Sequence, residues 1–251
     1  MQELEYKFVN NCGASLIFLN GFRMPYNNWD KVCDLLTSEH SILRYNRKGV
    51  GNSTRANITQ SGKEIIEQLI HLISIVKLDP PYVLVGHSLG GIYAEVFARK
   101  HPQLVSAVIL VDATHPQEAL SNHLKEKERS LTIRRIYQFL STLFDKHKFS
   151  ELESIEDTVS YLQSLGSFPN IPVSIITGDK NLPFVSQSSH DSHRKYQEAF
   201  LELSEQTTMH VLSNSHHFPQ ISEPAEVANI ILKTMSQASM QRNNTNTNLY
   251  K

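Results

Sequence analysis

The fold is decided by the stretch Tyr82-Val83-Leu84-Val85-Gly86-His87-Ser88-Leu89-Gly90-Gly91. Its first four residues are apolar or aromatic, as in a strand that is buried on both faces of a sheet. The residues that follow, Ile92–Lys100, predict a helix that ends before Pro102. Because Gly86 and Gly90 let neighbouring backbone pass close by, we predict a tight strand–turn–helix bend. Ser88 then projects above the sheet at the N-terminus of a helix.

Similar apolar runs recur on both sides of this stretch, with helical patterns between them. We predict core strands at Ser15–Leu19, Ser41–Tyr45, Tyr82–Val85, Ala107–Val111, Val173–Thr177 and Met209–Leu212, and one further strand near the edge at Leu4–Val9. Further helices are predicted at Glu64–Val76, Arg194–Leu203 and Ala225–Met235. Strands that alternate with helices indicate an α/β fold with a mostly parallel sheet.

One long segment interrupts this alternation. Residues 117–168 are charged, contain no convincing strand and carry apolar residues at helical intervals, among them Leu140, Leu143 and Phe144. The segment is longer than a single crossover requires, so we predict a helical cap insertion over one end of the sheet. Residues 1–116 and 169–236 then form the core. Residues 237–251 are rich in Asn and Thr and predict a disordered tail.

The composition excludes several classes of partner. Lys and Arg number 24 and Asp and Glu number 25 in the 251 residues, so the charge is close to balanced. That balance gives no indication of a nucleic-acid partner. No apolar run is long enough for a membrane span, and the polar N-terminus does not resemble a signal peptide. The two cysteines, Cys12 and Cys33, match no metal-binding spacing, and we expect a cytoplasmic protein.

Four other segments resemble the α/β-hydrolase superfamily, over a range from about residue 4 to about residue 235. They are Leu19-Asn20-Gly21-Phe22, the loop 45–53, Ile109-Leu110-Val111-Asp112-Ala113 and Ser215-His216-His217-Phe218-Pro219. The resemblance implies an α/β-hydrolase fold, with a mostly parallel sheet flanked by helices and a helical cap insertion. It also implies a serine hydrolase with Ser88 as nucleophile, and no cofactor.

The resemblance assigns further roles at the nucleophile. The backbone N–H groups of Phe22 and Leu89 would form the oxyanion hole, which stabilises the negative oxygen of the tetrahedral intermediate. Asn20 and His87 are candidate substrate contacts. Asn20 stands where the family usually has His, and Asn46 where it usually has Asp. Neither position is expected to take part in the chemistry.

A serine hydroxyl needs a base to remove its proton, and twelve histidines compete for that role. His217 follows the last predicted strand and precedes the final helix, which is the family position, so we predict that it is the base. Neighbouring His216 replaces the usual Gly. His190 and His193 have possible metal spacing, but no third ligand is evident, so we predict no metal site and a solvated helix start there.

The acid that orients the histidine has three possible origins. The family usually places it in a G-x-x-D pattern, but the corresponding segment here ends in Asn181. Asp112, at the end of the predicted strand beside the nucleophile strand, is our first choice, and some branches of the family place the acid there. Asp179, two residues before the usual position, is the alternative acid. A degenerate triad is the third possibility.

The predicted reaction is acyl transfer through an acyl-enzyme on Ser88, with a small, apolar ester as the substrate. A different class is also open: a non-catalytic or weakly catalytic small-molecule-binding homologue, which the substitutions at Asn20, Asn46 and Asn181 favour. The sequence does not indicate an oligomeric state.

Overall fold

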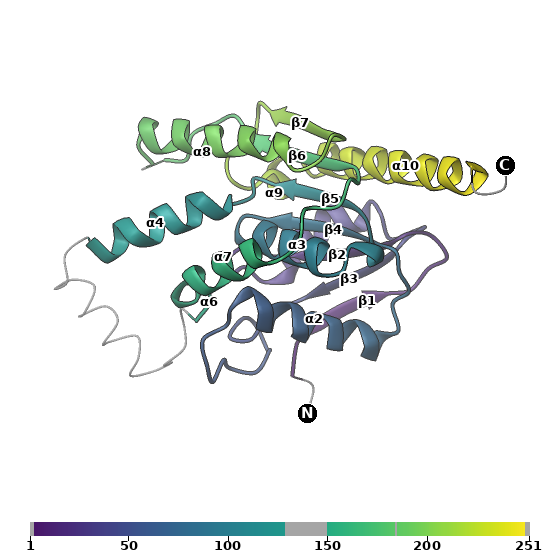
Figure 1. The fold of residues 1–251 in the computed structure, drawn as a ribbon, viewed down its shortest axis with the longest axis horizontal. Helices are drawn as coiled ribbons and strands as arrows, with labels where there is room; N and C mark the ends of the chain where they lie inside the picture. Colours follow the sequence, from purple (N-terminus) through teal and green to yellow (C-terminus); the bar gives the residue numbers. More distant parts are fainter. Residues whose placement is uncertain (1–2, 129–149, 184, 249–251) are drawn as a thin grey trace.

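The computed structural model describes residues 3–128, 150–183 and 185–248 (Figure 1). Its centre is a seven-stranded sheet in the order β1-β3-β2-β4-β5-β6-β7. The strands are β1 Tyr6–Val9, β2 Ser15–Leu19, β3 Ser41–Tyr45, β4 Tyr82–His87, β5 Val105–Val111, β6 Val173–Gly178 and β7 Thr207–Leu212. Only the β1–β3 pair is antiparallel. This confirms the α/β fold with a mostly parallel sheet.

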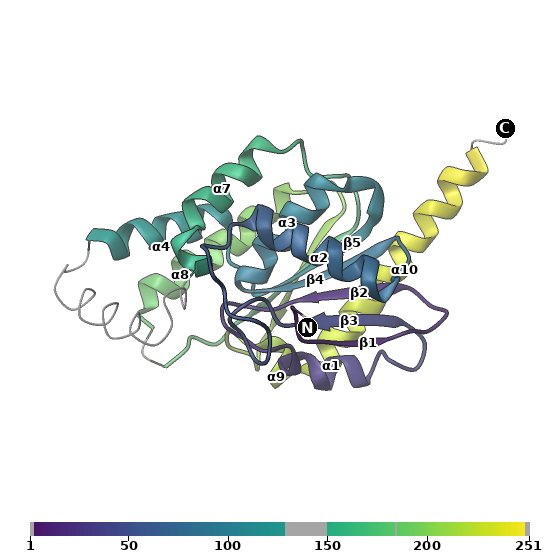
Figure 2. The same cartoon turned by 90° about the horizontal axis from the view of Figure 1, so that it is seen from below.

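Helices cover both faces of the sheet (Figure 2). One face carries α2 Gly62–Val76 and α3 Leu89–Lys100, and the other carries α1 Asp30–Asp34, α9 Pro219–Ser222 and α10 Pro224–Asn248. Each face has its own apolar core, one around Leu84 and Val96 and the other around Val85 and Ile231. Because the strand residues alternate between the two cores, the strands are apolar throughout, as the sequence predicts.

The predicted strands all appear in the structure, and most differ by only a few residues at their ends. Among the helices, α8 spans Gln187–Ala199 and begins seven residues before the predicted start at Arg194. Its first turn is polar and gives no apolar periodicity. The Ser186 side chain caps this turn by accepting a hydrogen bond from the Ser189 N–H at 3.2 Å. Hydrogen bonding rather than burial therefore sets where α8 begins.

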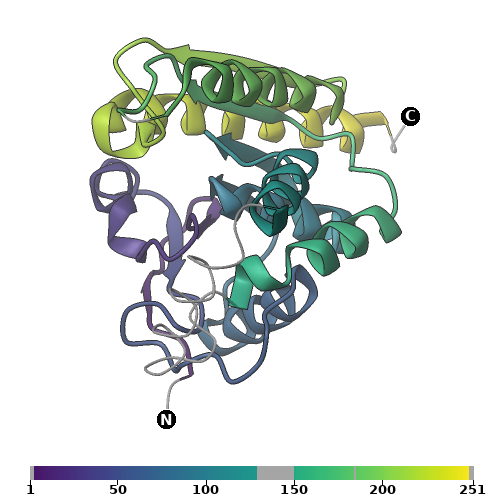
Figure 3. The ribbon, with the colours of Figure 1, turned by 90° about the vertical axis from the view of Figure 1, so that its left-hand side faces the viewer.

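Three described helices fall in or at the edge of the range predicted as a cap: α4 Pro116–Glu128, α6 Ser150–Glu153 and α7 Ile155–Ser164. Helix α7 packs against α2 and α4, and α4 extends beyond the sheet (Figures 1 and 3). Leu140, Leu143 and Phe144, predicted to face the core or the substrate, lie outside the described residues. The boundaries of the cap stay a prediction.

The last helix runs into the range that the sequence assigns to a polar tail. Helix α10 reaches Asn248, and Ala238 within that range is only 5 % exposed and belongs to the second core. The sequence pattern around it shows few apolar residues, so this contact depends on the neighbouring helix and strands. In the ranges 3–128, 150–183 and 185–248, no helix has the length and apolarity that a membrane crossing requires.

Helix α3 carries a buried acid whose protonation couples to folding. Glu95 is 2 % exposed, its Oε2 lies 3.7 Å from Arg99, and its Oε1 has no hydrogen-bond partner. Burial raises the pKa of Glu95 from 4.5 to about 7, although the charge of Arg99 opposes the change. The folded protein therefore binds a proton that the unfolded chain has already released.

We predict that Glu95→Gln becomes more stable relative to wild type as the pH rises. A carboxyl with a raised folded pKa contributes its stability below pH 4.5 and loses it as the pH passes 7. The difference should be about 3 kcal/mol between pH 4.5 and pH 8. Urea unfolding at several pH values measures it, with the exposed Glu198→Gln as control. A difference that stays constant with pH contradicts the prediction.

Candidate active site

Ser88 lies at a strained bend between β4 and α3. Its backbone has φ 50° and ψ −124°, a region that side-chain-bearing residues rarely adopt. The bend is possible because the residues two positions before and two positions after Ser88 are glycines. A Cβ at Gly86 would lie 2.6 Å from the Gly90 oxygen, and one at Gly90 would lie 2.2 Å from the Leu19 oxygen. The predicted tight turn is therefore present, and the hydroxyl lies at the N-terminus of α3.

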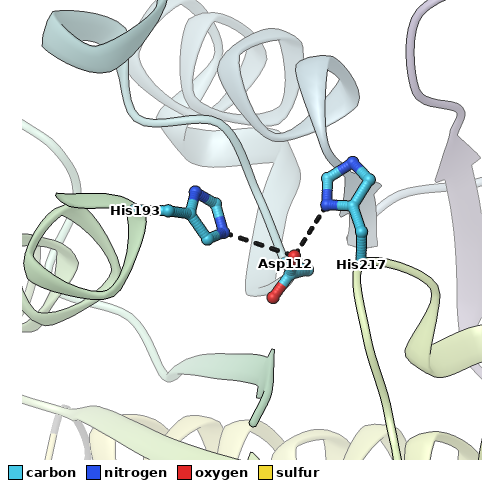
Figure 4. Close-up of side chains that lie close together, drawn as sticks. All are labelled: Asp112, His193 and His217. Atoms are coloured by element: carbon cyan, nitrogen blue, oxygen red, sulfur yellow. Dashed lines mark hydrogen bonds and ion pairs between the residues drawn. The ribbon is translucent and has the colours of Figure 1, made fainter. Parts of the chain in front are cut away.

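His217 reaches this hydroxyl from the loop between β7 and α9. Its Nε2 lies 3.1 Å from Ser88 Oγ, and its Nδ1 lies 2.7 Å from Asp112 Oδ2 (Figure 4). In this arrangement Ser88 Oγ donates to Nε2 while Nδ1 donates to the carboxylate. The structure thus brings together the three residues that the sequence proposed as nucleophile, base and acid.

Asp112 directly follows β5, the strand beside β4, and is 3 % exposed. Its second carboxylate oxygen, Oδ1, accepts hydrogen bonds from Thr177 Oγ1 at 2.9 Å and from the Gly178 N–H at 3.0 Å. Burial by itself would raise the pKa of Asp112, but His193 and His217 outweigh it and hold the pKa far below its usual range. These contacts therefore favour the ionised form of Asp112.

A second histidine contacts the same carboxylate, and the sequence analysis did not anticipate it. The Nε2 atom of His193 on α8 lies 3.3 Å from Asp112 Oδ2 (Figure 4). Its Nδ1 lies 2.9 Å from Glu118 Oε1. The prediction of a solvated helix start is wrong for His193, whose side chain is 19 % exposed. The signal in the sequence was weak, because Glu118 and His193 are 75 residues apart and on different helices.

The alternative acid does not reach the histidine. Asp179 Oδ1 accepts a hydrogen bond from Arg194 Nη1 at 2.5 Å, and this pair is exposed. Asn181, at the usual family position of the acid, donates to the Val185 oxygen. His216 is within 3.1 Å of the Lys180 oxygen through Nδ1. Among these alternatives only Asp112 touches His217.

The loop after β2 lies directly beside Ser88. A Cβ at Gly21 would lie 3.2 Å from Ser88 Cβ, so the backbone of this turn faces the nucleophile. Leu89 is the first residue of α3, and the first amides of a helix have no acceptor within it. The oxyanion-hole role of the Phe22 and Leu89 N–H groups is compatible with this placement and stays a prediction.

Asn20 and His87, the candidate substrate contacts, have their side chains turned into the fold. Asn20 is 2 % exposed, donates to the Tyr45 oxygen and accepts from Trp29 Nε1. His87 Nε2 lies 2.8 Å from the backbone oxygen of His217. Burial, together with the nearby His217, lowers the pKa of His87 to about 3, so it is neutral and donates this bond. Both side chains therefore contact other parts of the fold, and neither lines the pocket beside Ser88.

The site opens into a pocket of about 870 Å³ between α4 and α8. Ser88 and His217 lie in its wall, and most of the other described lining residues are polar: Asp112, Thr114, Glu118, Ser121, Asn122, Lys180, Asn181, Ser186, Ser188, Ser189, His190, Ser192, His193 and His216. Leu182, Val185 and Tyr196 add some apolar surface. The described lining is therefore mostly polar, whereas the sequence analysis predicts an apolar ester as the substrate.

Asp112, His193 and His217 also form a group whose possible metal-ligand atoms lie within 4.8 Å of one another. A metal would have to displace the proton between His217 and Asp112, and the one on His193. Burial lowers the pKa of His193. The contacts with Asp112 and Glu118 outweigh burial and raise the pKa to about 10. Without a metal ion, the two carboxylates therefore favour the protonated form of His193.

The sequence profile of the Alpha/beta hydrolase family matches residues 16–230 of the chain. An uncharacterised protein of Bacillus subtilis (strain 168), YqjL, is 22 % identical over 213 residues, which cover 84 % of this chain and 79 % of that protein. The 1-acylglycerol-3-phosphate O-acyltransferase ABHD5 of Rattus norvegicus is 29 % identical over 101 residues, 39 % of this chain and 28 % of its own length. The chain spans about 40 % of the length of several further curated relatives.

Solved structures show the same fold. An esterase from Thermogutta terrifontis superposes with a TM-score of 0.67 and 20 % identity, covering 94 % of this chain and 93 % of that one. The epoxide hydrolase CorEH gives a TM-score of 0.68 and 16 % identity, with 93 % and 94 % covered. At these identities the likeness establishes the fold and leaves the reaction to the residues of the site.

A buried ion pair fixes the loop beside Ser88. Arg47 donates to both carboxylate oxygens of Glu151 in α6, at 2.7 and 2.9 Å, and also to the backbone oxygens of Asn20 and Gly21. Both side chains of the pair are at most 4 % exposed. One guanidinium thus joins helix α6 to the turn that faces the nucleophile.

We predict that Glu151→Ala destabilises the protein by about 3–5 kcal/mol, because it leaves the buried charge of Arg47 without a partner. The matched control is Glu67→Ala, which removes the exposed partner of Lys100 and should cost less than about 1 kcal/mol. Urea unfolding at neutral pH compares the two. Equal effects from both variants would show that the buried pair does not hold the loop.

Proposed function

This chain belongs to the α/β-hydrolase family, and on that premise we propose that it is a serine hydrolase that cleaves a small ester. The observation that carries the proposal is the continuous contact from Ser88 Oγ to His217 at 3.1 Å and from His217 to Asp112 at 2.7 Å. A serine at a strained bend, a histidine within bonding distance and an ionised buried acid are the parts that nucleophilic acyl transfer requires.

In the proposed mechanism His217 Nε2 takes the proton of Ser88 as Oγ attacks the carbonyl carbon of the ester. Asp112 stabilises the imidazolium that forms, while its second oxygen is held by Thr177 and Gly178. His217 then gives the proton to the departing alcohol, leaving an acyl group on Ser88. Water, activated by the same histidine, releases the acid and restores the free serine.

The negative oxygen of the tetrahedral intermediate requires donors on the side of the loop after β2. We assign that role to the N–H groups of Phe22 and Leu89, supported by the closeness of Gly21 to Ser88 and by the position of Leu89 at the start of α3. The partial positive charge at that helix end adds to the stabilisation.

The described lining of the pocket bears on the substrate. Its serines, Asn122 and Lys180 offer many hydrogen-bonding groups and little apolar area. We therefore propose a small ester with polar groups or a short acyl chain, in place of the apolar ester that the sequence suggested. Burying a long alkyl chain here would remove polar groups from water without partners.

We also propose that the protein works in the cytoplasm. Cys12 and Cys33 are both free thiols, Cys12 exposed and Cys33 buried. Unpaired thiols of this kind are typical of reducing compartments.

The proposal predicts that a fluorophosphonate probe labels wild type and that Ser88→Ala abolishes the labelling. The probe reports an activated serine directly, without knowledge of the natural substrate. Ser164→Ala is the control, since Ser164 is an exposed serine outside the pocket whose hydroxyl donates to the Tyr161 oxygen. Folded wild type that does not label would instead support the small-molecule-binding homologue.

A second prediction separates the two acids. Asp112→Asn should lower kcat by about 10³–10⁴-fold, because an amide cannot stabilise the imidazolium by charge. Asp179→Asn, which only loses an exposed pair with Arg194, should stay near wild type. A series of p-nitrophenyl esters of increasing chain length measures both variants. It also tests the substrate, since turnover should fall from acetate to octanoate. Full activity of Asp112→Asn would remove the assignment of the acid.

A further inference from the structure

His193 is placed as a bridge between two buried carboxylates. Its Nδ1 lies 2.9 Å and 3.1 Å from the two oxygens of Glu118, and its Nε2 lies 3.3 Å from Asp112 Oδ2. Nδ1 makes a hydrogen bond to Glu118, whereas Nε2 lies at ion-pair distance from Asp112 without the alignment of a hydrogen bond. A positive charge on this ring is attracted by both carboxylates. The two contacts therefore favour a charged His193.

The elements that carry these groups are held firmly. Helix α8 is fixed to the loop after β5 by Gln197 Nε2, which donates to the Ala113 oxygen at 2.6 Å and is fully buried. Glu118 lies in the first turn of α4, where the helix dipole favours an acid, and is 9 % exposed. His193 thus connects α8, α4 and the end of β5 at one point.

We propose that His193 is a positioning residue of this site: an imidazolium held between Asp112 and Glu118 that fixes the carboxylate used by His217 and acts on His217 through its positive charge. The inference rests on the proposed hydrolase function. His193 is within 6.2 Å of His217, measured between ring centres, so the two rings disfavour each other's positive charge.

Among the described residues, the charged and titratable groups that face His193 come from three other elements and from its own helix. Asp112 faces it from β5, Glu118 from α4 and His217 from the loop after β7. On its own helix His190 lines the same pocket, and Arg194 is paired with Asp179. Lys180 and His216 line the pocket from the loops after β6 and β7. The two carboxylates in direct contact determine the charge of His193.

Two variants separate a charge effect from a bracing effect. His193→Gln removes a positive charge and Glu118→Gln removes a negative one, yet both break the same contact. We expect His193→Gln to move the acidic midpoint of the pH profile of kcat/KM upward and Glu118→Gln to move it downward. For charges 6.2 Å apart, the upward displacement should be roughly half a pH unit to two pH units.

A third variant supplies the control. His101→Gln removes an imidazole at the C-terminal end of α3, the opposite end from Ser88, and should leave the midpoint unchanged. If His193→Gln and Glu118→Gln lower kcat without displacing the midpoint in opposite directions, His193 is only a structural brace and the proposal is wrong.

A measurement without turnover keeps the two proposals apart. NMR of protein with ¹⁵N-labelled histidine follows the titration of His217 and reports whether both nitrogens of His193 carry protons up to pH 8. Opposite displacements of the His217 titration without fluorophosphonate labelling would support the charge role and overturn the hydrolase function. Labelling together with an unchanged His217 titration in both variants would support the hydrolase function and overturn the charge role of His193.

Discussion

Two adjacent strands end in backbone bends that L-residues rarely adopt, and the site depends on both. Ser88 after β4 has φ 50°, and Asp112 after β5 has φ 41°. The two segments are hydrogen-bonded to each other, since the Ser88 N–H donates to the oxygen of Val111 in β5 and the Thr114 N–H donates to the Ser88 oxygen. Strain of this kind persists only where the surrounding structure determines it. Here the parallel pairing of β4 and β5 brings nucleophile and acid to the same edge of the sheet.

The carboxylate of Asp112 organises the charges around that edge. One oxygen is occupied by Thr177 and Gly178, which leaves the other directed toward His217 and His193. An isolated buried carboxylate would be costly, and the donors and the positive charge around it remove that cost. The same contacts set its direction, so that His217 is oriented with Nε2 toward the hydroxyl.

Acids from the range predicted as a cap reach the site from two sides. Glu118 in α4 contacts His193, and Glu151 in α6 contacts Arg47, which in turn holds the oxygens of Asn20 and Gly21. Both acids are buried, with less than a tenth of their surface exposed. These described parts of the predicted cap therefore bring buried carboxylates to the edge of the sheet where Ser88 and His217 lie.

The sequence by itself determined where the strands lie along the chain, the bend at Ser88 and the loop that carries His217, because local apolar runs and glycines encode these features directly. It left Asp112 and Asp179 both open, and it did not indicate that His193 and Glu118 meet. Only the tertiary structure decided these points, since residues 75 or more apart come together through the pairing of strands and the packing of α4 and α8. Such a contact leaves no periodic trace in a single chain, and the polar first turn of α8 concealed the helix that carries His193.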